Sequence, residues 1–144
     1  MTTAIDTNVL QGLWTGTPPV MAAAQAALEG VSQRGALVIS PAVYAELVAS
    51  PGRDAQMIDT FIGVARIRVD WLLERAVWRT AADAFRGYSE RRRAQERSSG
   101  PRRILADFLI GAHALHHASA LLTFDQGLYR AAFPALTVLV PSVL

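Results

Sequence analysis

The sequence predicts an α/β domain in which helices flank a small parallel sheet. Short apolar segments of three or four residues alternate with longer stretches of helical periodicity along the chain. The 144 residues match the size of one domain, and apolar types make up 51% of them against 18% charged types. We therefore expect one domain over residues 1–144, built around a single core.

The strand candidates are aliphatic or β-branched and end at turn signals. They cover residues 3–5, 36–39, 67–69, 120–123 and 137–139. Helices are expected over residues 19–33, 41–49, 55–65, 71 to about 93, 101–118 and 127–132. Ser40 before Pro41, and Ser99-Gly100 before Pro101, predict capped helix starts with proline in the first turn, and Asp70 is placed to cap the helix after it.

Several classes of protein are excluded by composition. No apolar run approaches the roughly 18 residues that a membrane-spanning helix needs. The first residues lack the basic and apolar segments of a signal peptide, and Asp6 lies where such a peptide is uncharged, so a cytoplasmic protein is expected. The absence of cysteine excludes disulfides, thiolate metal sites and cysteine nucleophiles.

All 14 basic residues are arginine, and seven of them fall within residues 86–103 against two glutamates. Arginine binds phosphate through two parallel hydrogen bonds, so this segment is a candidate RNA-steering patch. A solvated charge run in an exposed loop, or the codon bias of a GC-rich genome, would explain the same pattern. The candidate RNA-binding residues are Arg91, Arg92, Arg93, Arg97, Arg102 and Arg103.

Acidic side chains follow two of the expected strands directly. Asp6 comes after the first strand, and Asp125 after the fourth. Ligands of open α/β sheets bind at the carboxyl ends of the strands, so the two acids meet if their strands are neighbours. Glu46 lies about a turn and a half into the helix after the second strand and can reach the same edge.

Asp107 lies within an expected helix that is apolar nearly all round, over residues 104–112. A buried carboxylate needs a cation or hydrogen-bond donors to remain charged. A bound metal ion would meet that need. A structural salt bridge with Arg102 or Arg103 is the alternative.

Together, Asp6, Glu46, Asp107 and Asp125 form an oxygen-only set that suits Mg²⁺ or Mn²⁺. Such ions activate water for phosphodiester hydrolysis. Receiver domains and aspartyl phosphatases also carry acids at strand ends, but they need a lysine, and this chain has none. His113, His116 and His117 do not form a zinc-protease signature, because Ala114 follows the first of them, so we expect a packed helix there.

These residues, in this order, resemble the PIN domain, and within it the VapC-type toxins of toxin–antitoxin modules. The resemblance covers nearly the whole chain. It is carried by four blocks: IDTN at residues 5–8, SPAVYAEL at 40–47, DFLIGAHA at 107–114, and LTFD at 122–125 with GLY at 127–129.

The resemblance implies a Mg²⁺- or Mn²⁺-dependent endoribonuclease that cuts tRNA or ribosomal RNA. It also implies a cognate antitoxin, which wraps the toxin and can place an arginine near the acidic site, and a homodimer. The family's acids map onto Asp6, Glu46, Asp107 and Asp125 as catalytic metal ligands, with Asn8 and Thr123 supporting them.

The chain departs from the family pattern at Phe124, where relatives often have a polar or basic residue, and residues 51–103 match only in general character. Two other functions stay open at this point. One is a non-catalytic RNA- or protein-binding module, which four converging acids without metal would disfavour. The other is a single-strand DNA nuclease of related fold, which usually needs more acids and a longer chain.

Overall fold

The computed structural model describes residues 1–95 and 103–143. The strands are β1 (Thr3–Ile5), β2 (Leu37–Ile39), β3 (Ile67–Val69), β4 (Ala120–Leu122) and β5 (Val138–Leu139). The helices are α1 (Thr7–Thr15), α2 (Pro18–Ser32), α3 (Pro41–Val48), α4 (Ala55–Ala65), α5 (Arg75–Ala94), α6 (Leu105–His117) and α7 (Gln126–Ala132).

The five strands form one parallel sheet in the order β3-β2-β1-β4-β5. The chain therefore starts in the middle of the sheet, extends it first on one side through β2 and β3, and then on the other through β4 and β5. Every crossover contains at least one helix, as parallel neighbours require. This arrangement confirms the fold class expected from the sequence.

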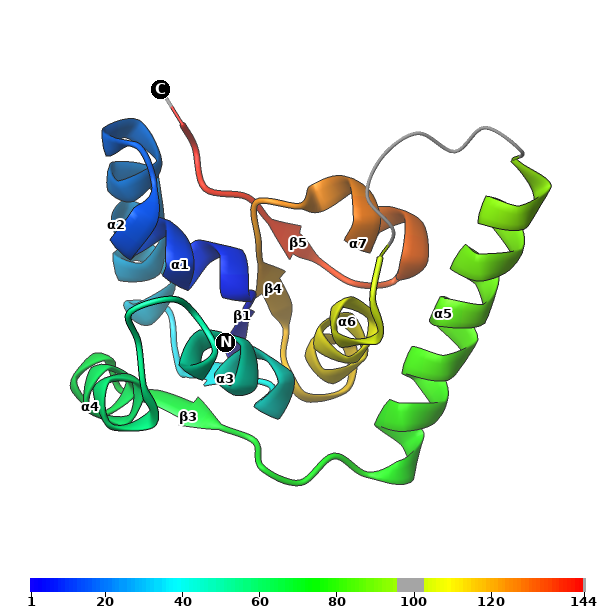
Figure 1. The fold of residues 1–144 in the computed structure, drawn as a ribbon, viewed down its shortest axis with the longest axis horizontal. Coiled ribbons are helices and arrows are strands. Elements are labelled where there is room, and N and C mark those ends of the chain that lie inside the picture. The colour runs from blue at the N-terminus through cyan, green and yellow to red at the C-terminus, as the bar shows by residue number, and fades with distance from the viewer. Residues whose placement is uncertain (96–102, 144) are drawn as a thin grey trace.

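Helices cover the sheet and bury its three central strands. In Figure 1, α2 and α5 lie on opposite sides of the molecule, and α6 lies between the strands and α5. The strand residues of β1, β2 and β4 are buried throughout, so their apolar runs read as continuous rather than alternating. Within the described part of the chain, no helix combines the length and apolar character that crossing a membrane requires.

α6 packs closely in the core because a glycine lies in its middle. A Cβ atom added to Gly111 would lie 2.2 Å from Cε2 of Phe133, whose ring is buried against the helix. The apolar segment that follows Asp107 is thus buried along α6, where Phe108 and Ile110 are at most 2% exposed. α5 covers its outer side, where the rings of Phe85 and Phe108 stack at 4.9 Å.

The expected strands agree with the structure to within one residue at each end, and most helices do too. The Ser40 cap is confirmed, because its hydroxyl accepts a hydrogen bond from the Ala42 N–H. α1 was not expected from the sequence, although Val9, Leu10 and Leu13 have helical spacing and pack in the core.

Two helices begin later than expected. α5 starts at Arg75 rather than 71, because the Asp70 N–H extends the β3 pairing by bonding to the Ile39 carbonyl. The Asp70 side chain binds His113, so the helix cap expected at Asp70 is wrong. α6 starts at Leu105 rather than 101. The Arg103 N–H bonds outside the helix, to the Tyr88 hydroxyl, and Ile104 is the extended N-cap residue, whose N–H bonds to the Asp107 side chain in the first turn. The expected cap at Ser99-Gly100-Pro101 lies outside the described residues.

Candidate active site

Adjacent strands bring Asp6 beside Thr123. β1 and β4 pair in parallel with Ile5 opposite Leu122, so the residues that follow each strand are also opposite one another. The Asp6 N–H donates to the Leu122 carbonyl at 3.0 Å, which continues the ladder. The Thr123 hydroxyl then donates to Oδ2 of Asp6 at 2.7 Å.

The Thr123 hydroxyl has its direction fixed by two other donors. The Asp125 N–H donates to it at 2.9 Å, and Nδ2 of Asn8 does so at 3.4 Å. With its acceptor positions used, its own proton points at the Asp6 carboxylate. Oδ1 of Asn8 in turn accepts from the Phe124 N–H at 3.1 Å. Thr123 and Asn8, in the first turn of α1, therefore hold the segment after β4 against the junction of β1 and α1. Their supporting role toward a bound metal stays a prediction.

Glu46 approaches this edge from α3 through a hydrogen bond with Thr7, a residue not predicted to belong to the site. The Thr7 hydroxyl donates to Oε1 of Glu46 at 2.6 Å, and Thr7 is the neighbour of Asp6 in the chain. The structure thus attaches Glu46 to the same edge by way of Thr7.

Asp107 lies in the first turn of α6, half-buried. Its Oδ2 accepts a hydrogen bond from the Ile104 N–H at 3.1 Å, one of the free donors at the start of the helix. Burial raises the pKa of Asp107, the Ile104 bond and the Arg103 charge oppose that rise, and the charge of Asp125 adds to it.

Asp6 is the most strongly perturbed acid of the site. Its pKa is raised to about 6, mainly by burial and in smaller part by the negative charge of Asp107, while the hydrogen bond from Thr123 and the nearby Tyr129 hydroxyl oppose the rise. A carboxylate in this setting lacks a sufficient counter-charge at neutral pH.

The pKa of Tyr129, on α7, is raised by burial and by the charges of Asp6, Asp107 and Asp125. The Tyr129 hydroxyl is buried and makes no hydrogen bond of normal geometry within the described residues. Tyr129 was part of a motif noted in the sequence, but its place in the site was not foreseen.

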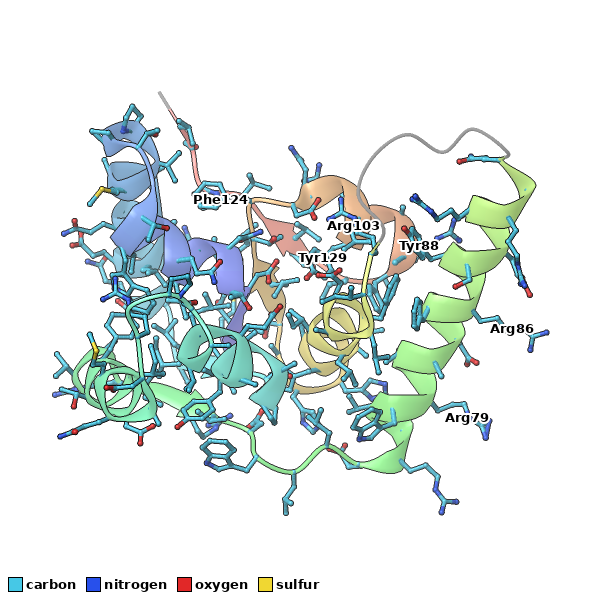
Figure 2. The ribbon with its side chains drawn as sticks, in the orientation of Figure 1. Arg79, Arg86, Tyr88, Arg103, Phe124 and Tyr129 are labelled. Atoms are coloured by element: carbon cyan, nitrogen blue, oxygen red, sulfur yellow. The ribbon has the colours of Figure 1, made fainter. Side chains whose placement is uncertain are left out.

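The guanidinium of Arg103 forms an ion pair with Asp125. It donates to Oδ2 of Asp125 at 2.5 Å and to Oδ1 at 3.5 Å. For Arg103, the salt bridge with Asp107 raised from the sequence is wrong, because its partner is Asp125. Arg102, the other partner considered, lies outside the described residues. Figure 2 shows Arg103 on the segment that leads into α6.

The described arginines of the predicted patch on α5 leave the helix in different directions. Arg91, Arg92 and Arg93 are consecutive in the last turn of α5, so their side chains leave the helix about 100° apart. Arg92 contacts the Tyr88 hydroxyl at 3.3 Å, and Arg91 lines a groove between α5 and the end of α7. Arg97 and Arg102 lie outside the described residues.

The histidines of α6 have structural partners, as expected. His113 is buried and bonds to Oδ2 of Asp70 at 2.8 Å, and His117 bonds to Oε1 of Glu74 at 2.6 Å. Burial lowers the pKa of His113, and the hydrogen bond to Asp70 opposes this. These bonds fasten α6 to the loop before α5.

The donor set suits a hard divalent cation. The ligand atoms that the described side chains offer at this edge are carboxylate, hydroxyl and amide oxygens, which Mg²⁺ and Mn²⁺ prefer. The unpartnered buried hydroxyl of Tyr129 and the raised pKa of Asp6 both indicate a place where a hydrated cation would add missing interactions. As the side chains lie, no three acids or histidines among residues 1–95 and 103–143 close around a single point, because internal donors hold Asp125 and Asp107.

A parallel α/β sheet with carboxylates at the carboxyl ends of its strands defines a protein with an acidic ligand site at the sheet edge. A family model described as the PIN domain matches residues 3–134. The chain belongs to the PIN domain family, in which nuclease activity is general. None of the curated proteins matches the chain.

Solved structures from toxin–antitoxin systems share this fold. The match to a toxin–antitoxin complex from Klebsiella pneumoniae has a TM-score of 0.66 and 20% identity, and covers 99% of each chain. VapBC2 from Rickettsia felis, bound to a promoter DNA fragment, gives 0.61 and 17%, covering 99% of this chain and 100% of that one. VapBC-1 from nontypeable Haemophilus influenzae gives 0.59 and 23%, covering 97% and 98%.

Proposed function

We propose that the chain is a metal-dependent endoribonuclease and the toxin of a VapBC-type toxin–antitoxin system. The observation that carries the proposal is the pair of hydrogen bonds by which Thr123 joins the Asp6 carboxylate to the Asp125 main chain, at the ligand edge of a PIN domain. Mg²⁺ or Mn²⁺ is the proposed cofactor, because the site offers only hard oxygen ligands.

Each acid has a proposed part. Asp6 and Asp107 are the principal metal ligands, and Glu46 and Asp125 complete the site directly or through water. When bound, the metal supplies an activated water and stabilises the leaving oxygen of the phosphodiester. Thr123 keeps one oxygen of Asp6 in a fixed orientation by donating its proton to it.

An antitoxin is the proposed protein partner. The structural neighbours are toxin–antitoxin complexes, one of them bound to promoter DNA, and the match extends over nearly the full length of both chains. A homodimer and a cytoplasmic location belong to the same proposal. Light scattering of the purified chain, alone and with its antitoxin, tests both assembly states.

Cleavage of a total RNA pool by antitoxin-free protein tests the activity. Discrete fragments are expected with Mg²⁺ or Mn²⁺ and none with EDTA. Asp6→Asn and Asp107→Asn are expected to lower the rate at least about 100-fold, since each removes a ligand charge. Asp83→Asn is the matched control, because Asp83 is an exposed acid on α5 away from the four carboxylates, and it should leave cleavage unchanged.

The outcomes separate the proposed enzyme from its rivals. Metal-dependent cleavage that persists in both site variants would overturn the assignment of the carboxylates. Cleavage of single-stranded DNA with intact RNA would replace the substrate class. Binding of RNA without cleavage of RNA or DNA at any metal concentration would favour the non-catalytic module.

A further inference from the structure

Asp125 is already paired with a cation from its own chain. Both of its carboxylate oxygens face the guanidinium of Arg103, and the two side chains are only 29% and 33% exposed. A charge-assisted pair in a partly buried setting is stronger than an exposed one, because water screens it less. The carboxylate oxygens that would face a metal ion are therefore engaged in its absence.

Arg103 is held in this place by a contact from another helix. Its backbone N–H donates to the Tyr88 hydroxyl of α5 at 2.8 Å. The Tyr88 ring packs against Phe108 of α6, with 5.4 Å between the ring centres. Figure 2 shows Tyr88 facing Arg103 across the space between these helices, while Arg79 and Arg86 point away from the molecule. Arg103 thus differs from the surface arginines in having its main chain anchored beside the acids.

The residue after Arg103 also donates a hydrogen bond to an acid of the site. The N–H of Ile104 binds Oδ2 of Asp107, so residues 103 and 104 together supply donors to two of the four carboxylates. Arg103 also opposes the burial-driven rise in the pKa of Asp107 by its charge. The short segment ahead of α6 therefore supplies internal donors to Asp125 and Asp107.

We propose that Arg103 competes with the divalent cation for Asp125 and so sets the metal affinity of the site. The inference rests on the proposed function, since it requires a metal ion at these carboxylates. The guanidinium occupies the side of the Asp125 carboxylate that it faces and offsets its negative charge, so the Arg103 pair and a cation at Asp125 oppose each other. The intact protein then binds metal more weakly than the carboxylates alone would.

Calorimetric titration of the metal-free protein with Mn²⁺ tests this without any activity measurement. Arg103→Gln removes the competing charge and is expected to tighten Mn²⁺ binding about five- to tenfold, a gain limited by the partial exposure of the pair. Arg103→Lys keeps the charge and should stay within about twofold of the wild type. Tyr88→Phe keeps the ring but releases the anchor, and should tighten binding by a smaller factor.

Arg130→Gln is the control for a general change in charge. Arg130 lies on α7, the helix that follows Asp125, and its only hydrogen bond in the described part of the chain is to Gln126. Equal tightening in Arg130→Gln and Arg103→Gln would overturn the competition. Unchanged or weaker binding in Arg103→Gln would overturn it too, with the proposed function intact. No Mn²⁺ binding by any variant would overturn the metal dependence, and the competition with it.

Discussion

The ionised carboxylate of Asp6 is expected to lower the free energy of unfolding. This carboxyl is buried, and the pKa rises from the ordinary 3.8 to about 6. The folded protein therefore binds the proton of Asp6 more tightly than the unfolded chain does. Stability contributed at low pH is lost as the pH rises from about 4 to about 6. Asp6→Asn cannot ionise, so the variant escapes this loss.

The magnitude follows from the displacement of the pKa. Each pH unit between the two values corresponds to about 1.4 kcal/mol, so the charged form of Asp6 costs about 3 kcal/mol of folding stability at neutral pH. Because Asp6 is only 6% exposed, this cost is not reduced much by solvent. The Asn side chain keeps an oxygen that can accept the bond from Thr123.

Urea unfolding of both proteins in EDTA, at intervals between pH 4 and pH 8, measures the effect. The stability of Asp6→Asn relative to the wild type is expected to grow by about 2–3 kcal/mol over this range, with the change centred below pH 6. His113 and the other titrating groups are common to both proteins and cancel in the difference. Added Mn²⁺ should narrow the gap by stabilising the wild type alone.

A difference in stability that does not vary with pH would refute this reasoning. It would mean that the substitution acts through packing or hydrogen bonding and that the Asp6 charge is compensated in the metal-free protein. A difference that shrinks as the pH rises would mean that the carboxylate is stabilised by its surroundings, which is the opposite of what its burial implies.

Two further substitutions test the packing and the electrostatics. Gly111→Ala places a methyl group against the buried Phe133 ring and should lower the free energy of unfolding by about 1–3 kcal/mol. Gly63→Ala on α4, where an added Cβ would meet no atom within 4 Å, should raise the free energy of unfolding by about 0.5–1 kcal/mol. Equal effects would contradict the close approach. Tyr129→Phe removes a hydroxyl that lowers the pKa of Asp6, so a ¹³C NMR titration in EDTA should place that pKa above 6. A lower value would mean that the hydroxyl acts on Asp6 mainly by excluding water.

The sheet and its acidic edge are predictable from sequence because short-range rules decide them. Buried parallel strands read as apolar runs, and the residue after each strand is then at the ligand edge, as for Asp6. Asp107 was noticed because a charge inside an apolar helix needs an explanation. Its raised pKa reflects the burial that the pattern predicts.

The parts that the sequence did not reveal depend on contacts between distant segments. The pairing of Arg103 with Asp125 and the capture of Glu46 by Thr7 join residues 22 and 39 positions apart. The late start of α6 depends on Tyr88, which lies on another helix. Local propensity carries no information about such partners, so the Arg-rich segment could be interpreted only as one patch.

The central position of β1 has a consequence for how the protein is made. β1 can pair with β2 soon after both have been synthesised, but its other neighbour, β4, follows only after β2, β3 and the helices between them. Asp6 therefore meets Thr123 and Asp125 only once β4 has left the ribosome. Long-range pairing of this kind folds late and is slow. A nascent chain that stalls before residue 120 therefore has an incomplete acidic edge.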